Sequence, residues 1–312
     1  MIVEIRDSTV VAMALMLSPG FGRDTLRKAL EAAYQRRTTI DKLVNEPPEV
    51  LGRILDTVTA TKILAARPLN AKTAEEMLIL YLQTGGRVAL VTDAAYPKPL
   101  KDLEQPPPML FYRGSQSLFS APAGAVVGAR KVSGEGLRLA AESAALLAAE
   151  GPVVSGGAAG VDLAAHEAAV EVSEGKTILV LPQGLSSYQA PEFIQEPFHD
   201  GRVLALSAEL PPLEWQTHQA VGRNPIIAAL ARAVVVIEPD KTGGSIRTAE
   251  AALALGRRVF VWGGPRPKKT VDNLLSMGAE PLVDDSGVLR GDVLREALHD
   301  EPQKPEDEAF LF

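Results

Sequence analysis

The sequence predicts an α/β protein: a doubly wound, mostly parallel sheet with helices on both faces, preceded by a small all-helical domain. From residue 124 onward, short β-branched runs alternate with alanine-rich helical segments, which is typical of parallel sheets covered by helices. These runs end in glycines and small polar residues, as strands of doubly wound folds do where they lead into helices. Before residue 85 the periodicity is helical, which predicts the separate helical domain.

The expected elements follow from this alternation. Strands are predicted at 124–128, 152–155, 177–181, 203–206, 233–237 and 258–262, with a last short strand near 281–283. Helices are predicted at 134–150, 161–174, 190–200, 223–231, 244–256 and 270–277. Upstream, 87–92 reads as a strand, while the proline-rich stretches 96–100 and 106–112 read as extended segments. We therefore expect a helical domain at 1–84, a sheet domain at 85–290 and an acidic segment and tail at 291–312.

The helical domain opens with two helices on either side of Pro19-Gly20-Phe21-Gly22. This pattern resembles the helix–hairpin–helix motif found in SAM-like domains, whose glycine turn can present amides to a DNA phosphate. A plain helical hairpin in a small bundle fits the same turn residues. Further helices are expected over 41–66, with a break at Pro47-Pro48, and over 73–84, ending at Gly85-Gly86.

Composition narrows the class of protein. The chain has 312 residues and no cysteine, which excludes disulfides, thiolate zinc sites and a cysteine nucleophile. Charged residues interrupt the first seven positions, and no apolar run approaches the roughly 18 residues of a membrane span, so a cytoplasmic protein is expected. The net charge of −7 argues against a general nucleic-acid coat but allows a local basic site.

The candidate site is a set of small-residue loops that follow predicted strands. In a parallel sheet these loops share one edge, where ligands bind, and amides at helix starts favour anions such as phosphate. The predicted binding residues are those of the loops and helix starts: Gly128, Arg130, Lys131, Ser133, Ser155, Gly156, Gly157, Arg223, Asn224, Gly243, Gly244, Ser245 and Thr248. We therefore expect a phosphate-binding edge, for a nucleotide or for a nucleic-acid backbone.

Several of these residues have an alternative role. Arg130 and Arg223 stand at loop-to-helix junctions where a guanidinium can reach phosphate bidentately, although each could instead make a surface salt bridge. The hydroxyls of the site can bind phosphate or cap helices. Asn224 precedes Pro225 and fits the N-cap position of a helix with proline at its first turn.

Asp162 and His166 are spaced i, i+4 on one predicted helix. They could form an acid–base pair or bind a metal, but no third ligand lies nearby in sequence, which favours an intrahelical hydrogen bond with the histidine packed against the sheet. The sequence contains no Ser–His–Asp order, zinc spacing, phosphate-binding Gly-x-x-x-x-Gly-Lys-Ser/Thr loop or Gly-x-Gly-x-x-Gly fingerprint. No catalytic residue, metal or cofactor is expected.

The order of these motifs resembles that of the DNA-processing protein DprA (Smf) family. The resemblance is carried by Tyr96-Pro97 to Gly114, Gly128-Ala129-Arg130 with Ser133, Ser155-Gly156-Gly157 to His166, Gly184-Leu185, Arg223-Asn224, and Gly243-Gly244-Ser245 with Thr248. It implies a Rossmann-like fold and a cytoplasmic, non-enzymatic homodimer that binds and protects single-stranded DNA. It also implies RecA recombinase as a partner in natural transformation, and it places the loop residues named above along the DNA groove.

The chain departs from the family pattern in three places. Ala159 stands where the family usually has a basic residue, and Pro225 replaces the second arginine of Arg-Asn-Arg. Each lost cation should flatten the salt dependence of DNA binding by roughly one phosphate equivalent. About 20 residues follow the last predicted element, so the family's winged-helix domain is expected to be absent.

Three readings of function remain open. The loops hold few aromatics for base stacking, and Tyr188, Phe193 and Trp262 are the candidates. A nucleotide-binding or nucleotide-cleaving protein is the alternative to a DNA binder, since 243–250 loosely resembles a phosphoribohydrolase loop followed by Glu250. The third interpretation is an interaction module whose acidic tail, ending in Phe310-Leu311-Phe312, docks in a partner's hydrophobic pocket, although a frayed terminus is the commoner explanation of such a tail.

Overall fold

The computed structural model describes residues 5–301, and the chain folds into two compact units. Unit 1 comprises Met1–Tyr96 and Gln105–Tyr112, and unit 2 comprises Pro97–Glu104 and Arg113–Phe312. The docking peptide expected at the C-terminal tail lies outside the described residues. No helix among residues 5–301 is long and apolar enough to cross a membrane.

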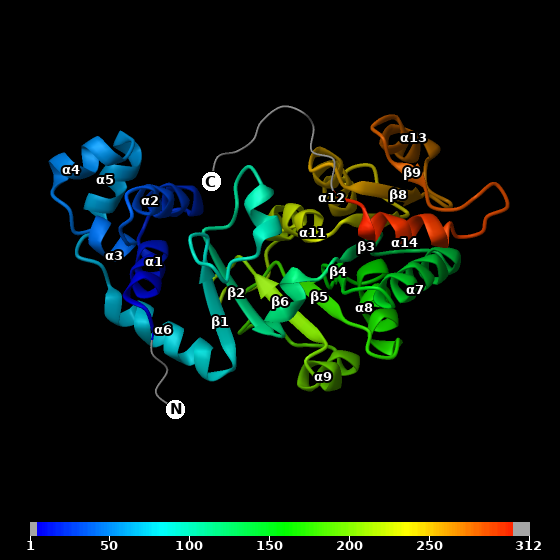
Figure 1. The fold of residues 1–312 in the computed structure, drawn as a ribbon, viewed down its shortest axis with the longest axis horizontal. Helices are drawn as coiled ribbons and strands as arrows, with labels where there is room; N and C mark the ends of the chain where they lie inside the picture. Colours follow the sequence, from blue (N-terminus) through cyan, green and yellow to red (C-terminus); the bar gives the residue numbers. More distant parts are fainter. Residues whose placement is uncertain (1–4, 302–312) are drawn as a thin grey trace. The chain divides into compact units, whose positions relative to one another are not determined.

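Unit 1 contains the N-terminal helices together with the first strand and most of the second (Figure 1). Its elements are α1 (Asp7–Leu17), α2 (Arg23–Gln35), α3 (Ile40–Leu43), α4 (Pro48–Ile54), α5 (Thr57–Ala65), α6 (Ala71–Gln83), β1 (Gly86–Leu90) and the greater part of β2 (Met109–Gly114). The segment expected to be helical over 41–66 divides into three short helices, and Pro48 opens the second because a proline is accommodated in a first helical turn.

The sequence pattern of α2 explains how this unit packs. Leu26, Ala29, Leu30 and Ala33 recur at helical spacing and are all buried. The turn before α2 follows the predicted hairpin, with Gly20 at a φ of 74°, which favours glycine. Tyr81 closes the other side of the unit, since its hydroxyl donates to the Tyr112 carbonyl at 3.0 Å.

Unit 2 is the predicted Rossmann-like α/β domain. Its strands are β3 (Gly124–Gly128), β4 (Val153–Ser155), β5 (Thr177–Val180), β6 (Val203–Ser207), β7 (Ala233–Ile237), β8 (Arg258–Trp262) and β9 (Glu280–Pro281). They lie in the order β6-β5-β4-β3-β7-β8-β9, and every one of these neighbouring pairs is parallel. The order reverses direction at β3, which therefore stands at the switch point where doubly wound sheets bind ligands.

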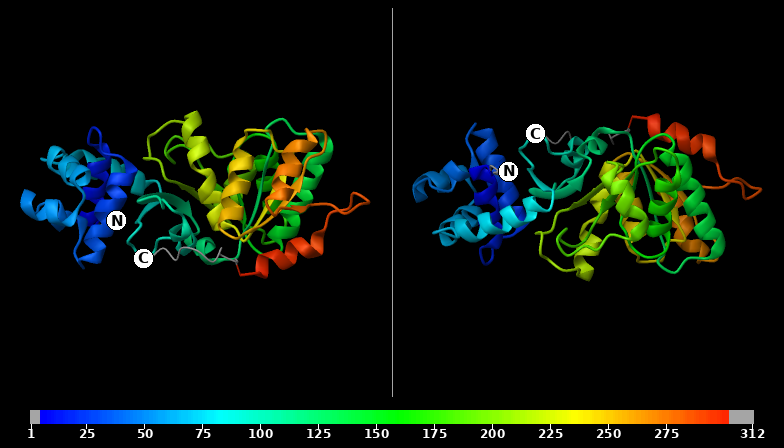
Figure 2. Two further views of the ribbon diagram at one scale, coloured as in Figure 1. Left: turned by 90° about the horizontal axis from the view of Figure 1, so that it is seen from above. Right: turned by 90° about the horizontal axis from the view of Figure 1, so that it is seen from below.

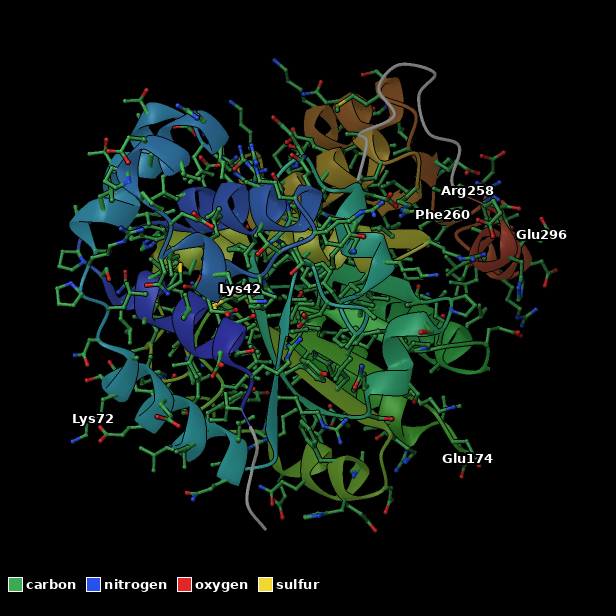
Figure 3. All side chains as sticks on the ribbon, turned by 60° about the vertical axis from the view of Figure 1, so that its left-hand side comes forward. Lys42, Lys72, Glu174, Arg258, Phe260 and Glu296 are labelled. Carbon is green, nitrogen blue, oxygen red and sulfur yellow. The ribbon has the colours of Figure 1, made fainter. Side chains whose placement is uncertain are left out.

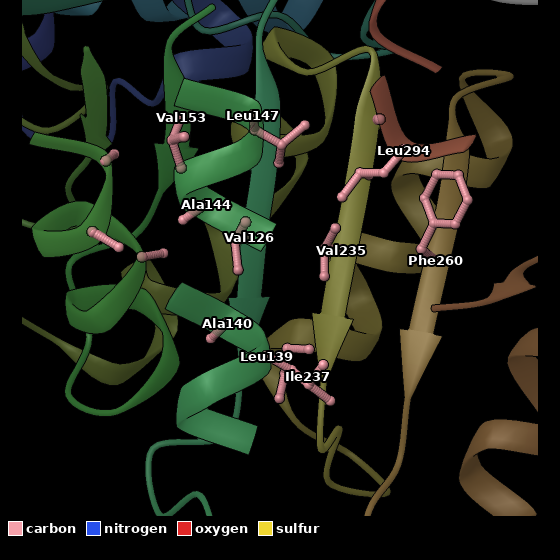
Figure 4. Packing of buried hydrophobic residues seen from close by; sticks show 14 of the residues in the cluster. Val126, Leu139, Ala140, Ala144, Leu147, Val153, Val235, Ile237, Phe260 and Leu294 are labelled. Carbon is pink, nitrogen blue, oxygen red and sulfur yellow. The ribbon is translucent and has the colours of Figure 1, made fainter. Parts of the chain in front are cut away.

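Helices cover both faces of this sheet (Figure 2). They are α7 (Gly134–Ala148), α8 (Val161–Glu171), α9 (Glu192–His199), α10 (Thr217–Gly222), α11 (Asn224–Leu230), α12 (Gly244–Ala254), α13 (Lys268–Ser276) and α14 (Gly291–His299), with 3₁₀ turns η1 (Lys98–Asp102) and η2 (Gln116–Ser120). Strand residues alternate between the two faces, as the period of a strand requires. Val126 and Val235 face α7, α8 and α14 in one apolar layer (Figure 4).

Two predictions about the fold are wrong. The stretch 96–100 is not extended throughout: from Lys98 it forms the turn η1, with Leu100 buried and Asp102 paired to Arg257. Helix α14 was not predicted, because its acidic composition obscured an apolar face in which Leu294, Ala297 and Leu298 recur at helical spacing. That face packs into the layer around α7, so burial outweighs the local charge.

An ion pair links β8 to β9, the last strand of the sheet. The Arg258 guanidinium lies 2.8 Å from Glu280 and also stands 5.2 Å from the centroid of the Phe260 ring (Figure 3). The loop that leads from β8 to α13 borders the candidate site.

Candidate nucleic-acid interface

The predicted loops meet at the carboxyl edge of the sheet in unit 2. They enclose two adjoining cavities of about 510 Å³ and about 300 Å³, which share Arg130, Ala158, Ala220 and Arg223. The larger cavity lies over β3 and β7 and is also lined by Lys131, Asn224, Asp240, Gly243, Gly244, Ser245, Thr248 and Arg266. The smaller one lies over β4 and β5 and is also lined by Gly156, Gly157, Ala159, Pro182, Tyr188 and Trp215. Of the predicted site residues, only Ser133 and Ser155 line neither cavity.

Arg130 is an exposed cation at the mouth of both cavities. Its guanidinium carbon lies 6.0 Å from the centroid of the Trp215 ring, a cation–π arrangement. Trp215 is itself 47% exposed, although a tryptophan in a folded protein is usually well covered. Trp215 was not predicted from sequence; the signal for it is an aromatic side chain in an otherwise polar stretch at 214–218.

The aromatics proposed from sequence are placed differently. Tyr188 lines the smaller cavity, and burial raises the pKa of its hydroxyl to about 12, so it stays protonated. Phe193 and Trp262 line neither cavity. Trp215 is therefore the exposed aromatic that the structure adds to the site.

Arg223 belongs to the buried framework rather than to the surface. Its Nη2 lies 3.7 Å from the Asp162 carboxylate, its Nη1 donates to the Val180 carbonyl at the end of β5, and both side chains of the pair are buried. A Cβ on Gly156 would stand 1.7 Å from this guanidinium, so a side chain there would displace Arg223 from its present position. Burial lowers the pKa of Arg223 and raises that of Asp162, while their mutual attraction opposes both changes.

The hydrogen bond predicted between Asp162 and His166 is absent from the described structure. Instead, His166 Nδ1 lies 2.6 Å from Thr177 Oγ1, which donates to the Val153 carbonyl. Because the threonine proton is used, Nδ1 must carry the proton of a neutral imidazole. Burial, with the nearby Arg223 charge, lowers the pKa of His166 to about 3. The histidine is packed against the sheet, as predicted, and residues 5–301 contain no group of three or more His, Cys, Asp or Glu placed to hold a metal.

The anion-binding position at the start of α7 is already occupied by a carboxylate of the protein itself. The Ser133 hydroxyl accepts from the Gly136 amide at 3.1 Å and donates to the Glu238 carboxylate, and the Ser133 amide donates to Glu238 at 3.1 Å. Glu238 is 1% exposed and occupies the position where an anion would meet this helix. In the next loop, Ser155 Oγ donates to the Val126 carbonyl at 2.6 Å. Both hydroxyls are therefore engaged in hydrogen bonds within the fold.

The start of α12 is open by comparison. Gly243 is the N-cap and supplies no side-chain cap, while Ser245 and Thr248 are buried at the cavity wall. The Thr248 hydroxyl donates back to the Gly244 carbonyl at 3.2 Å. The first amides of α12 therefore have no side-chain cap where they border the larger cavity.

Asn224 lies beside this helix start but is not an N-cap. Arg223 takes the N-cap position of α11, and Asn224 is its first residue, so the predicted capping role is wrong. Its side chain is 3% exposed, and its Nδ2 has no acceptor among the described residues. A buried unpaired donor is costly. An oxyanion in the larger cavity, which Asn224 lines, would supply an acceptor.

Arg266 ties the loops of the larger cavity together and was also missed from sequence. Its Nη1 lies 2.9 Å from Asp240, its Nε lies 3.5 Å from Glu238, and its Nη2 donates to the Lys131 carbonyl. The Lys131 side chain remains exposed. Arg266 thus joins the loops after β3, β7 and β8.

The carboxylates expected of a nucleotide-cleaving site are not at the cavities. Glu250 is exposed on α12 and lines neither of them, and Glu209 is buried beside the Ser207 hydroxyl, to which its amide donates. The acids that do line the larger cavity, Asp162 and Asp240, are each paired with an arginine.

Comparison with known proteins agrees with this architecture. Residues 87–290 match the family model described as DNA recombination-mediator protein A. The chain belongs to the DprA (Smf) family. The DprA of Streptococcus pneumoniae is 37% identical over 172 residues, which are 54% of this chain and 60% of that protein. The DprA of Bacillus subtilis is 30% identical over 215 residues, 66% of this chain and 72% of that protein.

Solved DprA structures share the fold. The X-ray structure of DprA from Streptococcus pneumoniae superposes with a TM-score of 0.74 at 26% identity, covering 94% of this chain and 99% of that one. The structure of DprA from Helicobacter pylori, described as having a unique single-stranded DNA binding mode, gives a TM-score of 0.56 at 26% identity. That match covers 68% of this chain and 96% of the Helicobacter chain. Both likenesses confirm the predicted family and fold class.

Proposed function

We propose that this chain binds single-stranded DNA at the carboxyl edge of the unit 2 sheet and catalyses no reaction on it. The observation that carries the proposal is the exposed Arg130 guanidinium beside the exposed Trp215 ring at the mouth of two cavities. A cation next to an uncovered aromatic is the combination that single-stranded DNA requires, with a charge for the phosphate and a face for the base. The single-stranded DNA binding described for the Helicobacter DprA supports the same class of ligand.

The binding chemistry follows from which groups are available. Arg130 and Lys131 attract phosphates, and the uncapped start of α12 with the unpaired Asn224 amide offers donors for one phosphate within the larger cavity. Trp215 stacks on a base of any sequence. The hydroxyls of Ser133 and Ser155 are already bonded within the fold, so they contribute through loop geometry. Such a site holds the backbone with little base readout.

Family membership extends the proposal to a biological role. We infer that the protein protects single strands and loads RecA recombinase on them during natural transformation, acting as a cytoplasmic homodimer. Ala159, exposed in the smaller cavity, and Pro225, in the first turn of α11, leave that side without the cations typical of the family. The expected result is DNA binding with a shallower salt dependence than other members have.

The test is fluorescence anisotropy with a labelled oligothymidylate across a salt series. Wild type is compared with Arg130→Ala and with Lys176→Ala, which removes an exposed cation directly before β5, at the opposite edge of the sheet. Binding that falls with salt and is weakened at least tenfold by Arg130→Ala, but not by Lys176→Ala, supports the proposal. Absence of binding by wild type at low salt refutes it.

A nucleotide is the second candidate ligand. The larger cavity, at about 510 Å³, lies in the range of about 300–1,000 Å³ typical of small-molecule pockets, and it holds the unpaired Asn224 donor. Cleavage of that nucleotide would need a carboxylate at the ligand, and Glu250 lines neither cavity. Calorimetric titration with nucleoside monophosphates separates the two ligands, and turnover abolished by Glu250→Gln would restore the enzymatic reading.

A further inference from the structure

Positive charge gathers at the loops after β3, β7 and β8. These loops and the first turns of their helices carry seven cations, all but Arg266 exposed: Arg130, Lys131, Lys241, Arg247, Arg266, Lys268 and Lys269. The same loops and turns carry three acids, Glu135, Glu238 and Asp240, so they hold a net positive charge within a chain whose net charge is −7. Local distribution rather than net charge identifies a nucleic-acid surface.

The two sides of Arg130 differ in usable charge. On the β4 and β5 side, the smaller cavity adds only Arg223, whose charge is balanced by Asp162 at 3.7 Å. On the β7 and β8 side, the larger cavity adds Arg266, whose charge is likewise balanced by Asp240 at 2.9 Å, and the exposed Lys131, which makes no ion pair with any of residues 5–301. A polyanion held at Arg130 is therefore drawn more strongly toward β8 than toward β5.

Arg266 leads from the cavity to the start of α13. It lines the larger cavity and contacts the Lys131 carbonyl, and two residues later Lys268 and Lys269 begin α13. Both lysines are exposed, and neither makes an ion pair with any of residues 5–301, whereas the nearby Asp240 is taken by Arg266 at 2.9 Å. Two unpaired ammonium groups therefore extend the basic surface beyond the residues predicted to bind DNA.

We propose that the bound single strand leaves the cavity at Arg130 across the loop from β8 to α13 and rests two phosphates on Lys268 and Lys269. This inference depends on the proposed function, since it extends the path of the same strand. Lysines act on phosphate as point charges without reading bases, so the extension adds affinity and salt dependence but no sequence preference.

The experiment compares oligothymidylates of about 6 and about 16 nucleotides, lengths within the range of single-strand binding sites. Anisotropy is measured across a salt series for wild type and for the double variant Lys268→Ala/Lys269→Ala. With the longer strand, the double variant should lower the slope of log K against log salt by about 1.4, because each lost phosphate contact removes about 0.7. With the shorter strand, held at the cavity, the slope should stay at the wild-type value.

The matched control is Lys98→Ala/Lys176→Ala, which removes the same charge from exposed positions in η1 and directly before β5. An equal decrease in slope with this control would mean that net charge alone is measured, and would overturn the inference. An unchanged slope for the double variant on the longer strand would overturn it while leaving the proposed function intact. An equal loss on both strands would place the lysines within the primary site and exclude an extended path. Failure of wild type to bind either strand would refute the proposed function and this inference with it.

Discussion

The starts of α7 and α12 look alike in sequence but differ in the folded protein. Each follows a central strand through a loop with glycine and serine, and each was predicted to bind phosphate. At α7 the Ser133 hydroxyl and amide are bonded to the buried Glu238 carboxylate. At α12 no side chain caps the helix, and the Nδ2 of the neighbouring Asn224 has no acceptor among the described residues. A helix start attracts anions only where the protein has not already supplied one.

The largest expected effect is the loss of stability on removing the Glu238 carboxylate from the start of α7. Glu238→Ala removes the carboxylate that holds Ser133 and contacts Arg266, so the free energy of unfolding should fall by about 3 kcal/mol. DNA affinity should not fall, because this carboxylate repels phosphate. Urea denaturation and anisotropy measure the two quantities, with Glu250→Ala on the exposed face of α12 as the control, expected within about 0.5 kcal/mol of wild type. A DNA-binding defect with normal stability would contradict the internal role of Glu238.

The buried His166 of α8 should make the free energy of unfolding depend on pH. His166 has a pKa of about 3 when folded, below the roughly 6.5 of an unfolded histidine, so the unfolded state binds the proton first as pH falls. Stability is therefore lost on going from about pH 6.5 toward pH 3, by about 2 kcal/mol at pH 5. His166→Gln should remove this part of the decline in a comparison of unfolding at pH 7 and pH 5. An identical decline in the variant would show that His166 is not kept neutral by the fold.

Trp215 provides a test of ligand binding by an exposed group of the site. Because its ring is exposed, Trp215→Ala should leave the unfolding free energy within about 0.5 kcal/mol of wild type. It should weaken binding to oligothymidylate by about 1–3 kcal/mol, the usual contribution of one stacked base. Trp215→Phe is the matched variant and should keep most of the affinity, as measured by anisotropy. Full affinity in Trp215→Ala would exclude stacking at this residue.

Asn224 gives the smallest and most specific effect. Asn224→Leu keeps the branched shape of the side chain while removing the unpaired buried Nδ2 donor, so the unfolding free energy should not decrease by more than about 1 kcal/mol. DNA affinity should fall by about 1 kcal/mol, because a hydrogen bond to the ligand is lost. Thr248→Val, which removes a hydroxyl already bonded to the Gly244 carbonyl, should change affinity less. Equal affinity losses in both variants would argue against a specific donor at Asn224.

The sequence alone determined the elements and the edge of the sheet that forms the site. β-branched runs gave the central strands β3, β7 and β8 nearly to the residue, because buried parallel strands leave a continuous apolar signal. Their loops meet at one edge in any parallel sheet, which is why eleven of the thirteen predicted residues line the cavities. Helix α14 was not predicted although Leu294, Ala297 and Leu298 recur at helical spacing, and its packing into the layer around α7 shows that this face is buried.

Only the tertiary structure decided which groups remain free to bind a ligand. The partners of Ser133 and Arg223 are Glu238, 105 residues away in the chain, and Asp162, 61 residues away, and no local pattern announces either pairing. Trp215 is exposed, and Lys268 and Lys269 make no ion pair within residues 5–301, because of what the folded chain leaves around them. Residue type and spacing specify what a group can bind, whereas long-range packing decides whether that capacity is already used within the protein.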